Sequence, residues 1–188
     1  MALSHQKLLT IHDFEAFTRL PENSEKYFEL IDGEIVEVPS NPYVSVIANL
    51  ISFYINLFLS QHKLQGHVTG EGGGFIINGH VFAPDVAYVE KLPSNKGYET
   101  IPPLLAVEVI SDPHSNTEQT DLRRKMIHYM QAGVVVWVVD YVARQIEVHV
   151  PEASVALLQD DDMLTLEGIL PDFKLAVKDI FPDEERTS

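Results

Sequence analysis

The chain contains no cysteine among its 188 residues. This absence excludes disulfide bonds, thiolate metal sites and a cysteine nucleophile, and it is typical of proteins from a reducing compartment. Basic residues are also scarce, with 13 Lys and Arg against 28 Asp and Glu, which gives a formal net charge of −15. Nonspecific nucleic-acid binding depends on Lys and Arg that neutralise phosphates, so this charge balance weighs against that class of protein.

Segments that would direct the chain to a membrane or out of the cell are lacking as well. The first ten residues do not combine a basic start with a sustained apolar stretch, as a secretory signal does. The most apolar segments, at 44–59 and 134–142, are too short or too interrupted by polar residues for a membrane span. We therefore expect a cytoplasmic protein without membrane association, folded as a single domain over residues 1–188.

Three common catalytic motifs are missing. The glycine-rich stretch at 71–74 is not followed by the Gly-Lys-Ser/Thr of a phosphate-binding loop. No HExxH arrangement is present, so the eight histidines are expected mainly at the surface. Ser111 lacks the glycine elbow of a serine hydrolase. These absences leave the acidic residues as the candidates for chemistry.

Hydrophobic periodicity predicts an α+β fold. Thr10 is placed to cap a short first helix, and Asp32-Gly33 predicts the turn of a hairpin over 26–39. A long helix is expected over 43–63, followed by two short strands around Asn78-Gly79.

The second half of the chain predicts an α/β-type core. An apolar strand at 104–111, a helix at 120–133 and a second apolar strand at 134–140 favour a right-handed parallel crossover. Antiparallel strands then follow to the end of the chain. The prediction is a mixed central sheet flanked by helices, with an N-terminal hairpin and C-terminal antiparallel strands.

Two carboxylates interrupt runs that otherwise resemble buried strands, Asp85 in FAPDVAYV and Glu108 in LLAVEVISD. An unpaired carboxylate costs several kcal/mol to remove from water. If the two strands are neighbours, opposed side chains lie about 5 Å apart, and one carboxylate must protonate unless a cation is shared. A hard divalent ion such as Mg²⁺ or Mn²⁺ would account for both, and it would supply a Lewis acid for phosphoester hydrolysis.

Nucleases of this kind usually also place a lysine near the metal. The position two residues after Glu108, which faces the same side of the strand, is occupied by Ile110. The following helix offers Lys125, whose long side chain could reach the same place from another element. Lys125, His128 and Tyr129 share one helical face. A buried ion pair between Glu108 and Lys125, and a turn-capping role for Asp85 after Pro84, are the purely structural alternatives.

Four stretches together resemble the Uma2 (DUF820) family: YFELIDGEIVEV, FAPDVAYVE, LLAVEVISDP and DLRRKMIHYMQAGVVVWVVD. The resemblance extends over nearly the whole chain and rests on the order and spacing of these stretches. The family is described as restriction endonucleases of the PD-(D/E)xK nuclease superfamily. The resemblance therefore implies a restriction-endonuclease-like fold.

The resemblance also implies roles for individual residues. Asp85 matches the aspartate of the PD motif, Glu108 the metal-binding acid, and Lys125 the relocated lysine. The backbone carbonyl of Val109 would be a further metal ligand. Glu29 is the candidate for an additional upstream acid. Two other glutamates of the hairpin, Glu34 and Glu37, are its rivals.

The function implied is a Mg²⁺- or Mn²⁺-dependent endonuclease that hydrolyses phosphodiester bonds in DNA. Cleavage of both strands requires two sites, so a homodimer is expected. Two alternatives stay open: a non-catalytic binding module that retains the nuclease fold, and a metal-dependent hydrolase of a small phosphorylated ligand. Basic residues around the Asp85–Glu108 cleft would favour DNA, and the candidates are Lys91, Lys96 and the run 123–125.

Overall fold

The computed structural model of the protein describes residues 8–38, 41–94 and 96–182. The N-terminal stretch compared above with a secretory signal lies mostly outside these ranges. The helical segments, in chain order, are α1 (Ile11–Thr18), η1 (Pro21–Asn23), α2 (Pro42–His62), α3 (Asn116–Gln131) and η2 (Val177–Ile180). The strands are β1 (Tyr27–Ile31), β2 (Glu34–Val38), β3 (His67–Gly70), β4 (Phe75–Ile77), β5 (His80–Phe82), β6 (Val86–Val89), β7 (Leu105–Ile110), β8 (Val135–Asp140), β9 (Gln145–His149), β10 (Ala156–Gln159), β11 (Met163–Leu166) and β12 (Leu170–Ala176).

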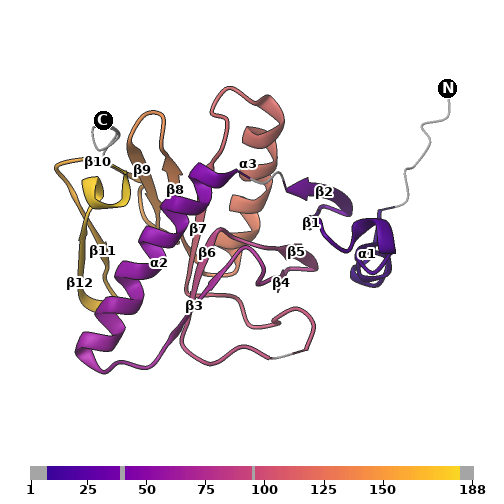
Figure 1. Ribbon diagram of the computed structural model, residues 1–188, viewed down its shortest axis with the longest axis horizontal. Helices are drawn as coiled ribbons and strands as arrows, with labels where there is room; N and C mark the ends of the chain where they lie inside the picture. The colour runs from indigo at the N-terminus through magenta and orange to yellow at the C-terminus, as the bar shows by residue number, and fades with distance from the viewer. Residues whose placement is uncertain (1–7, 39–40, 95, 183–188) are drawn as a thin grey trace.

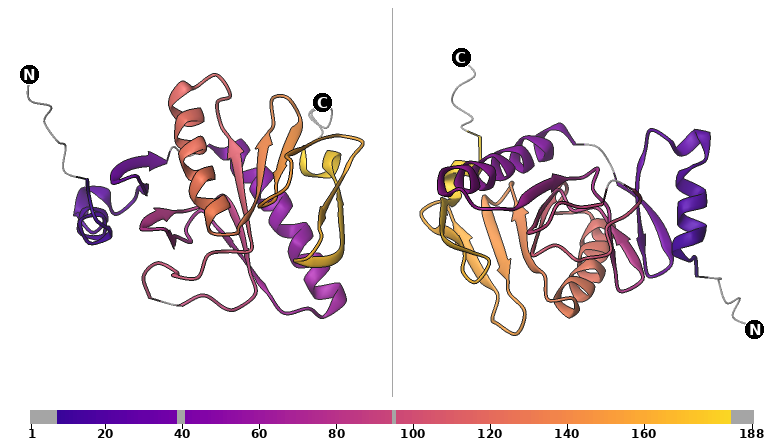
Figure 2. Two further views of the ribbon diagram at one scale, coloured as in Figure 1. Left: turned by 180° about the vertical axis from the view of Figure 1, so that it is seen from behind. Right: turned by 90° about the horizontal axis from the view of Figure 1, so that it is seen from below.

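The central sheet has six strands in the order β10-β9-β8-β7-β6-β3. Strands β7 and β8 are parallel and joined through α3, whereas the other neighbours are antiparallel. Figures 1 and 2 show α2 across one face of this sheet and α3 on the opposite face. The predicted α+β fold with a mixed central sheet and a parallel crossover is confirmed.

Alternation along β7 separates the two faces of the sheet. Leu105, Val107 and Val109 pack toward α2, while Ala106 and Ile110 belong to the core on the α3 side. Glu108 lies between Ala106 and Ile110 in this alternation, so its side chain points toward α3. Every residue of β7 is buried, as expected for a strand covered on both faces.

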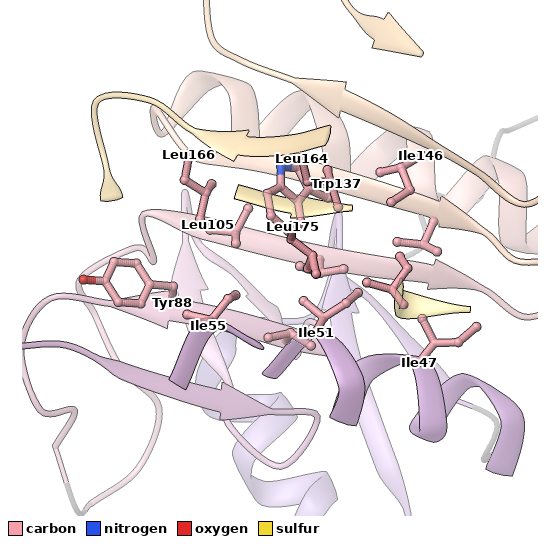
Figure 3. Close-up of a cluster of buried hydrophobic side chains, with 14 of the residues drawn as sticks. Ile47, Ile51, Ile55, Tyr88, Leu105, Trp137, Ile146, Leu164, Leu166 and Leu175 are labelled. Carbon is pink, nitrogen blue, oxygen red and sulfur yellow. The ribbon is translucent and has the colours of Figure 1, made fainter. Parts of the chain in front are cut away.

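The core beneath α2 is apolar and continuous. Ile47, Ile51 and Ile55 point from the helix toward the sheet, where Trp137 of β8 is fully buried (Figure 3). The two-stranded sheet of β11 and β12 closes the same cluster. The apolar run 134–140, expected as a buried strand, therefore belongs to the core.

A second sheet lies beside α3 and carries the N-terminal hairpin. Its order is β2-β1-β5-β4. The turn between β1 and β2 has positive φ at both Asp32 and Gly33, the conformation that an Asp-Gly hairpin turn favours. Thr10 caps α1 through a reciprocal pair of hydrogen bonds with Asp13, as its position predicts. This second sheet brings β1 to the α3 face of the central sheet.

Three local predictions were wrong or incomplete. Strand β3 was not expected, because its four residues gain their stability from pairing with β6. Helix α3 begins at Asn116 rather than at 120, since Ser115 accepts a hydrogen bond from the backbone of Glu118 and caps the first turn. The apolar segment 44–59 was considered too short for a membrane span, but the helix that contains it, α2, extends over Pro42–His62. By length and composition alone, α2 could cross a membrane.

Candidate active site

Asp85 and Glu108 face each other at the start of β6 and within β7. The antiparallel register pairs Val86 with Val107, and its continuation by one step places Asp85 opposite Glu108. Both side chains lie on the α3 face of the sheet. The backbone N–H of Val109 donates a hydrogen bond of 2.7 Å to Asp85 Oδ2. The structure thus brings together the two carboxylates that the sequence singled out.

Lys125 reaches this pair from α3, although it lies on a different element. Its Nζ donates to Glu108 Oε2 at 2.7 Å and to Glu29 Oε1 at 2.9 Å. All three side chains are buried, and Glu29 also accepts a hydrogen bond from the backbone N–H of Ala83 at 2.7 Å. The ammonium therefore lies on the same face of the sheet as Ile110, the residue found two positions after Glu108 where a lysine was sought in the sequence.

Tyr129, which the sequence placed on the same helical face as Lys125 without giving it a role, is a further member of the site. Its hydroxyl donates to Glu108 Oε1 at 2.8 Å, so Glu108 is held at both oxygens. Tyr129 and Lys125 are the two buried residues of α3, and they lie one turn apart. The spacing of i and i+4 was visible in the sequence, but the partner on β7 was not.

The rival acids of the hairpin lie elsewhere. Glu34 pairs with Arg124 at 2.9 Å, and Glu37 pairs with Lys26 at 3.0 Å, both with largely exposed carboxylates. Glu37 lines the rim of the pocket described below, but it does not contact Lys125. Of the three glutamates proposed as the upstream acid, Glu29 is the one that the fold joins to Lys125.

The charges of this cluster do not balance. Burial raises the pKa of Asp85 to about 7, and the neighbouring Glu108 carboxylate adds to the increase. Burial also raises the pKa of Glu29, against the opposing effect of Lys125. Burial alone would lower the pKa of Lys125, but Glu108 and Glu29 raise it above its ordinary value. Three carboxylates and one ammonium leave a formal charge of −2 when all are ionised.

The site opens into a pocket of about 400 Å³ between α3, the first turn of α2 and the ends of β6 and β7. Its charged lining residues are Glu29, Glu37, Asp85, Glu108, Asp112, Glu118, Asp121 and Lys125. Lys125 is the only basic residue among the described lining residues. Lys91, Lys96, Arg123 and Arg124 do not line this pocket, so the basic surround that would favour DNA is not found there.

A second polar cluster joins the hairpin turn, β5 and α3. Oxygen and nitrogen atoms of Asp32, His80 and His128 lie within 4.8 Å of one another, close enough to share a metal ion. Arg124 Nε also donates to Asp32 at 2.7 Å, and this contact is the main reason why the pKa of Asp32 is lowered. Sequence reasoning had expected the histidines mainly at the surface, and no short motif signals this group.

Hydrogen bonding argues that the second cluster is structural. The backbone N–H of Asp32 donates to His80 Nδ1 at 2.9 Å. A metal on Nδ1 would take the lone pair that accepts this bond, and a metal on Nε2 would require a proton on Nδ1. The bond would be lost in either case. His128 Nε2 lies 3.0 Å from Asp32 Oδ1, so the cluster fastens α3 to the hairpin without an ion.

Comparisons with known proteins identify the fold and the family of the chain. A solved structure from Anabaena variabilis ATCC 29413, described as a "putative nuclease belonging to DUF820", superposes with a TM-score of 0.74 and 20% sequence identity. The match covers 92% of this chain and 97% of that one, and it shows a shared fold. No curated protein matches the chain. The model of the Uma2 family, described as "Putative restriction endonuclease", matches residues 14–178 and so includes every residue of the site. The chain therefore belongs to the Uma2 family.

Proposed function

We propose that this chain is a Mg²⁺- or Mn²⁺-dependent endonuclease that hydrolyses phosphodiester bonds in DNA. The observation that carries the proposal is the unbalanced charge of Glu29, Asp85 and Glu108 beside the single ammonium of Lys125. A divalent cation would neutralise the formal charge of −2 and allow Asp85 to ionise at neutral pH. The donors are carboxylate oxygens, which Mg²⁺ and Mn²⁺ prefer.

The side chains of Asp85 and Glu108 would hold the metal, with the backbone carbonyl of Val109 as a third ligand. When bound, the metal would polarise the phosphodiester and lower the pKa of a bound water. Glu108 is fixed for this role by Lys125 and Tyr129, which hold its two oxygens. Asp85 is fixed by the N–H of Val109. The ligands are thus oriented before any substrate arrives.

Lys125 would stabilise the negative charge that develops on the phosphate. Its raised pKa keeps it protonated at neutral pH, so it serves as a hydrogen-bond donor rather than as a general base. Two of its three N–H groups are directed at Glu29 and Glu108, which leaves one for a phosphate oxygen. Glu29 would act as a positioning residue, because it holds the ammonium from the opposite side.

A metal-dependent hydrolase of a small phosphorylated ligand is the second candidate. The acidic lining of the pocket favours it, because a long polyanion meets repulsion outside the site as well as within it. A small ligand would meet only the groups next to the metal.

Plasmid nicking separates these candidates. We expect the wild type to nick supercoiled plasmid in the presence of Mg²⁺ or Mn²⁺ but not EDTA. Asp85→Asn and Glu108→Gln should lose this activity, and calorimetry should show lost metal binding. Glu147→Gln is the matched control, because Glu147 is an exposed residue of β9, and this variant should retain both.

A wild type that binds metal and hydrolyses a small phosphoester, but does not nick DNA, would establish the second candidate. A wild type that binds metal and cleaves neither substrate would point to a non-catalytic binding module. Absence of metal binding at millimolar concentration would refute the metal site itself.

A further inference from the structure

Helix α2 has two apolar faces, and the described protein covers only one of them. Val44, Ile47, Ile51, Ile55 and Leu59 are buried against the sheet. On the outer side, Val46 is 46% exposed, Phe53 56% and Leu57 37%. The 21 residues of Pro42–His62 include no Asp, Glu, Lys or Arg, although charged residues make up 22% of the chain. Such a helix is unusual at a surface of net charge −15.

The outer apolar residues follow a heptad-like pattern. Val46, Leu50, Phe53 and Leu57 are spaced by four, three and four residues, the spacing of a seam between two packed helices. The pattern is also self-complementary. When a second α2 packs antiparallel about a dyad between Leu50 and Phe53, each Leu50 meets the partner's Phe53 and each Val46 meets the partner's Leu57. A two-fold interface requires such self-complementarity.

We propose that the outer face of α2, formed by Val46, Leu50, Phe53 and Leu57, is a homodimer interface in which two copies of α2 pack antiparallel. The charge of the protein favours a second copy over other occupants. Two chains of −15 repel each other wherever carboxylates meet, and α2 offers a surface without any. Anionic membranes would repel the same acidic chain, and no Lys or Arg in α2 counters that repulsion.

The size of the interface sets the expected affinity. A helix of this length is about 31 Å long and about 10 Å wide, so its outer face provides less than the ~800 Å² per partner of a standard interface. We therefore expect a dimer that dissociates in the micromolar range rather than an obligate one. Val44 lines the candidate active site, and the two copies of Val44 would lie about 22 Å apart along the paired helices. Each end of the helix pair would then carry one pocket.

Analytical ultracentrifugation between about 1 and 200 μM tests the interface. We expect the wild type to dimerise within this range and Phe53→Glu to weaken the dimer at least tenfold. Ile127→Glu is the matched control, because Ile127 is 58% exposed on α3 and should tolerate the same change without effect on dimerisation. Circular dichroism shows whether each variant is folded. A wild type that stays monomeric at 200 μM, or a folded Phe53→Glu that dimerises like the wild type, would overturn the proposal.

The absence of cysteine makes the antiparallel geometry testable. Val46→Cys and Leu57→Cys chains should form a disulfide-linked dimer when mixed and oxidised, whereas neither should cross-link alone. Efficient cross-linking of each variant alone would indicate a parallel arrangement and refute the proposed one. Flotation of the wild type with lipid vesicles would refute it in favour of a membrane surface. These readouts do not depend on nuclease activity, so an inactive protein would leave them unchanged.

Discussion

Replacement of Lys125 by methionine should destabilise the protein far more than an ordinary loss of an ion pair. Methionine has a similar length but carries no charge, so Glu29 and Glu108 would be left in a buried site without a cation. Loss of one partner from a buried ion pair typically costs about 3–5 kcal/mol, because the remaining charge is uncompensated. For a chain of this size, each kcal/mol lowers the melting temperature by about 2–4 °C. We therefore expect a decrease of roughly 10 °C in EDTA.

The chain supplies a matched control for this experiment. Lys26 pairs with Glu37 at 3.0 Å, but the two side chains are 47% and 53% exposed. Lys26→Met should cost less than about 1 kcal/mol, as exposed pairs do. Urea denaturation of both variants, at pH 5 and pH 8, measures the difference.

The pH dependence distinguishes a lost charge from lost packing. Burial raises the pKa of Glu29, so when Lys125 is gone Glu29 can be accommodated by taking up a proton, and the penalty should be smaller at pH 5 than at pH 8. A packing defect would not change with pH. Equal effects of Lys125→Met and Lys26→Met at pH 8 would refute the reasoning that the ammonium holds the buried glutamates.

Three further predictions concern the same cluster. The pKa of Asp85 is raised to about 7 in the folded state, from an unfolded value near 4. In EDTA, between these two pH values, the folded state therefore keeps a proton that the unfolded state releases. The free energy of unfolding should fall as pH rises through this range. Asp85→Asn should flatten that dependence in urea titrations, and an unchanged slope would contradict it. Tyr129→Phe should weaken Mg²⁺ binding about tenfold in calorimetry without loss of fold, because Oε1 of Glu108 loses its hydrogen-bond donor. An unchanged Mg²⁺ affinity would show that the hydroxyl is dispensable. Glu29→Gln should reduce plasmid nicking while Glu34→Gln does not, and the reverse result would transfer the upstream role to Glu34.

Local patterns predicted most of the fold. The Asp32-Gly33 turn, the periodicity of α2 and the apolar run of β7 each carry their own signal within a short window. Strand β3 has no such signal, because its identity depends on pairing with β6 about twenty residues later. The start of α3 was missed although Ser115 and Glu118 have the spacing of a capping box. In the structure, Glu118 instead accepts hydrogen bonds from the backbone of Ser111 and Asp112.

The part of the site that could be predicted is the part fixed by the pairing of two neighbouring strands. The opposition of Asp85 and Glu108 follows once β6 and β7 are neighbours, and strand neighbours in sequence are commonly neighbours in space. The contact of Lys125 with Glu29 joins positions 96 residues apart, and the resemblance to a family rather than any local pattern pointed to it. The cluster of Asp32, His80 and His128 follows from no strand pairing and matches no sequence motif, so only the three-dimensional structure reveals it.

The attachment of α3 to the sheet explains why the site is part of the fold rather than an addition to it. An ordinary helix buries an apolar stripe, but the two buried residues of α3 are Lys125 and Tyr129, and both donate to Glu108. On its neighbouring face, Arg124 and His128 bind Asp32 of the hairpin. These charge-dependent polar contacts hold the helix in addition to the apolar packing of Leu122, Met126 and Met130 against the sheet. It follows that a cation shared by Asp85 and Glu108 would alter the charge that Lys125 meets, so metal binding and the docking of α3 should be energetically linked.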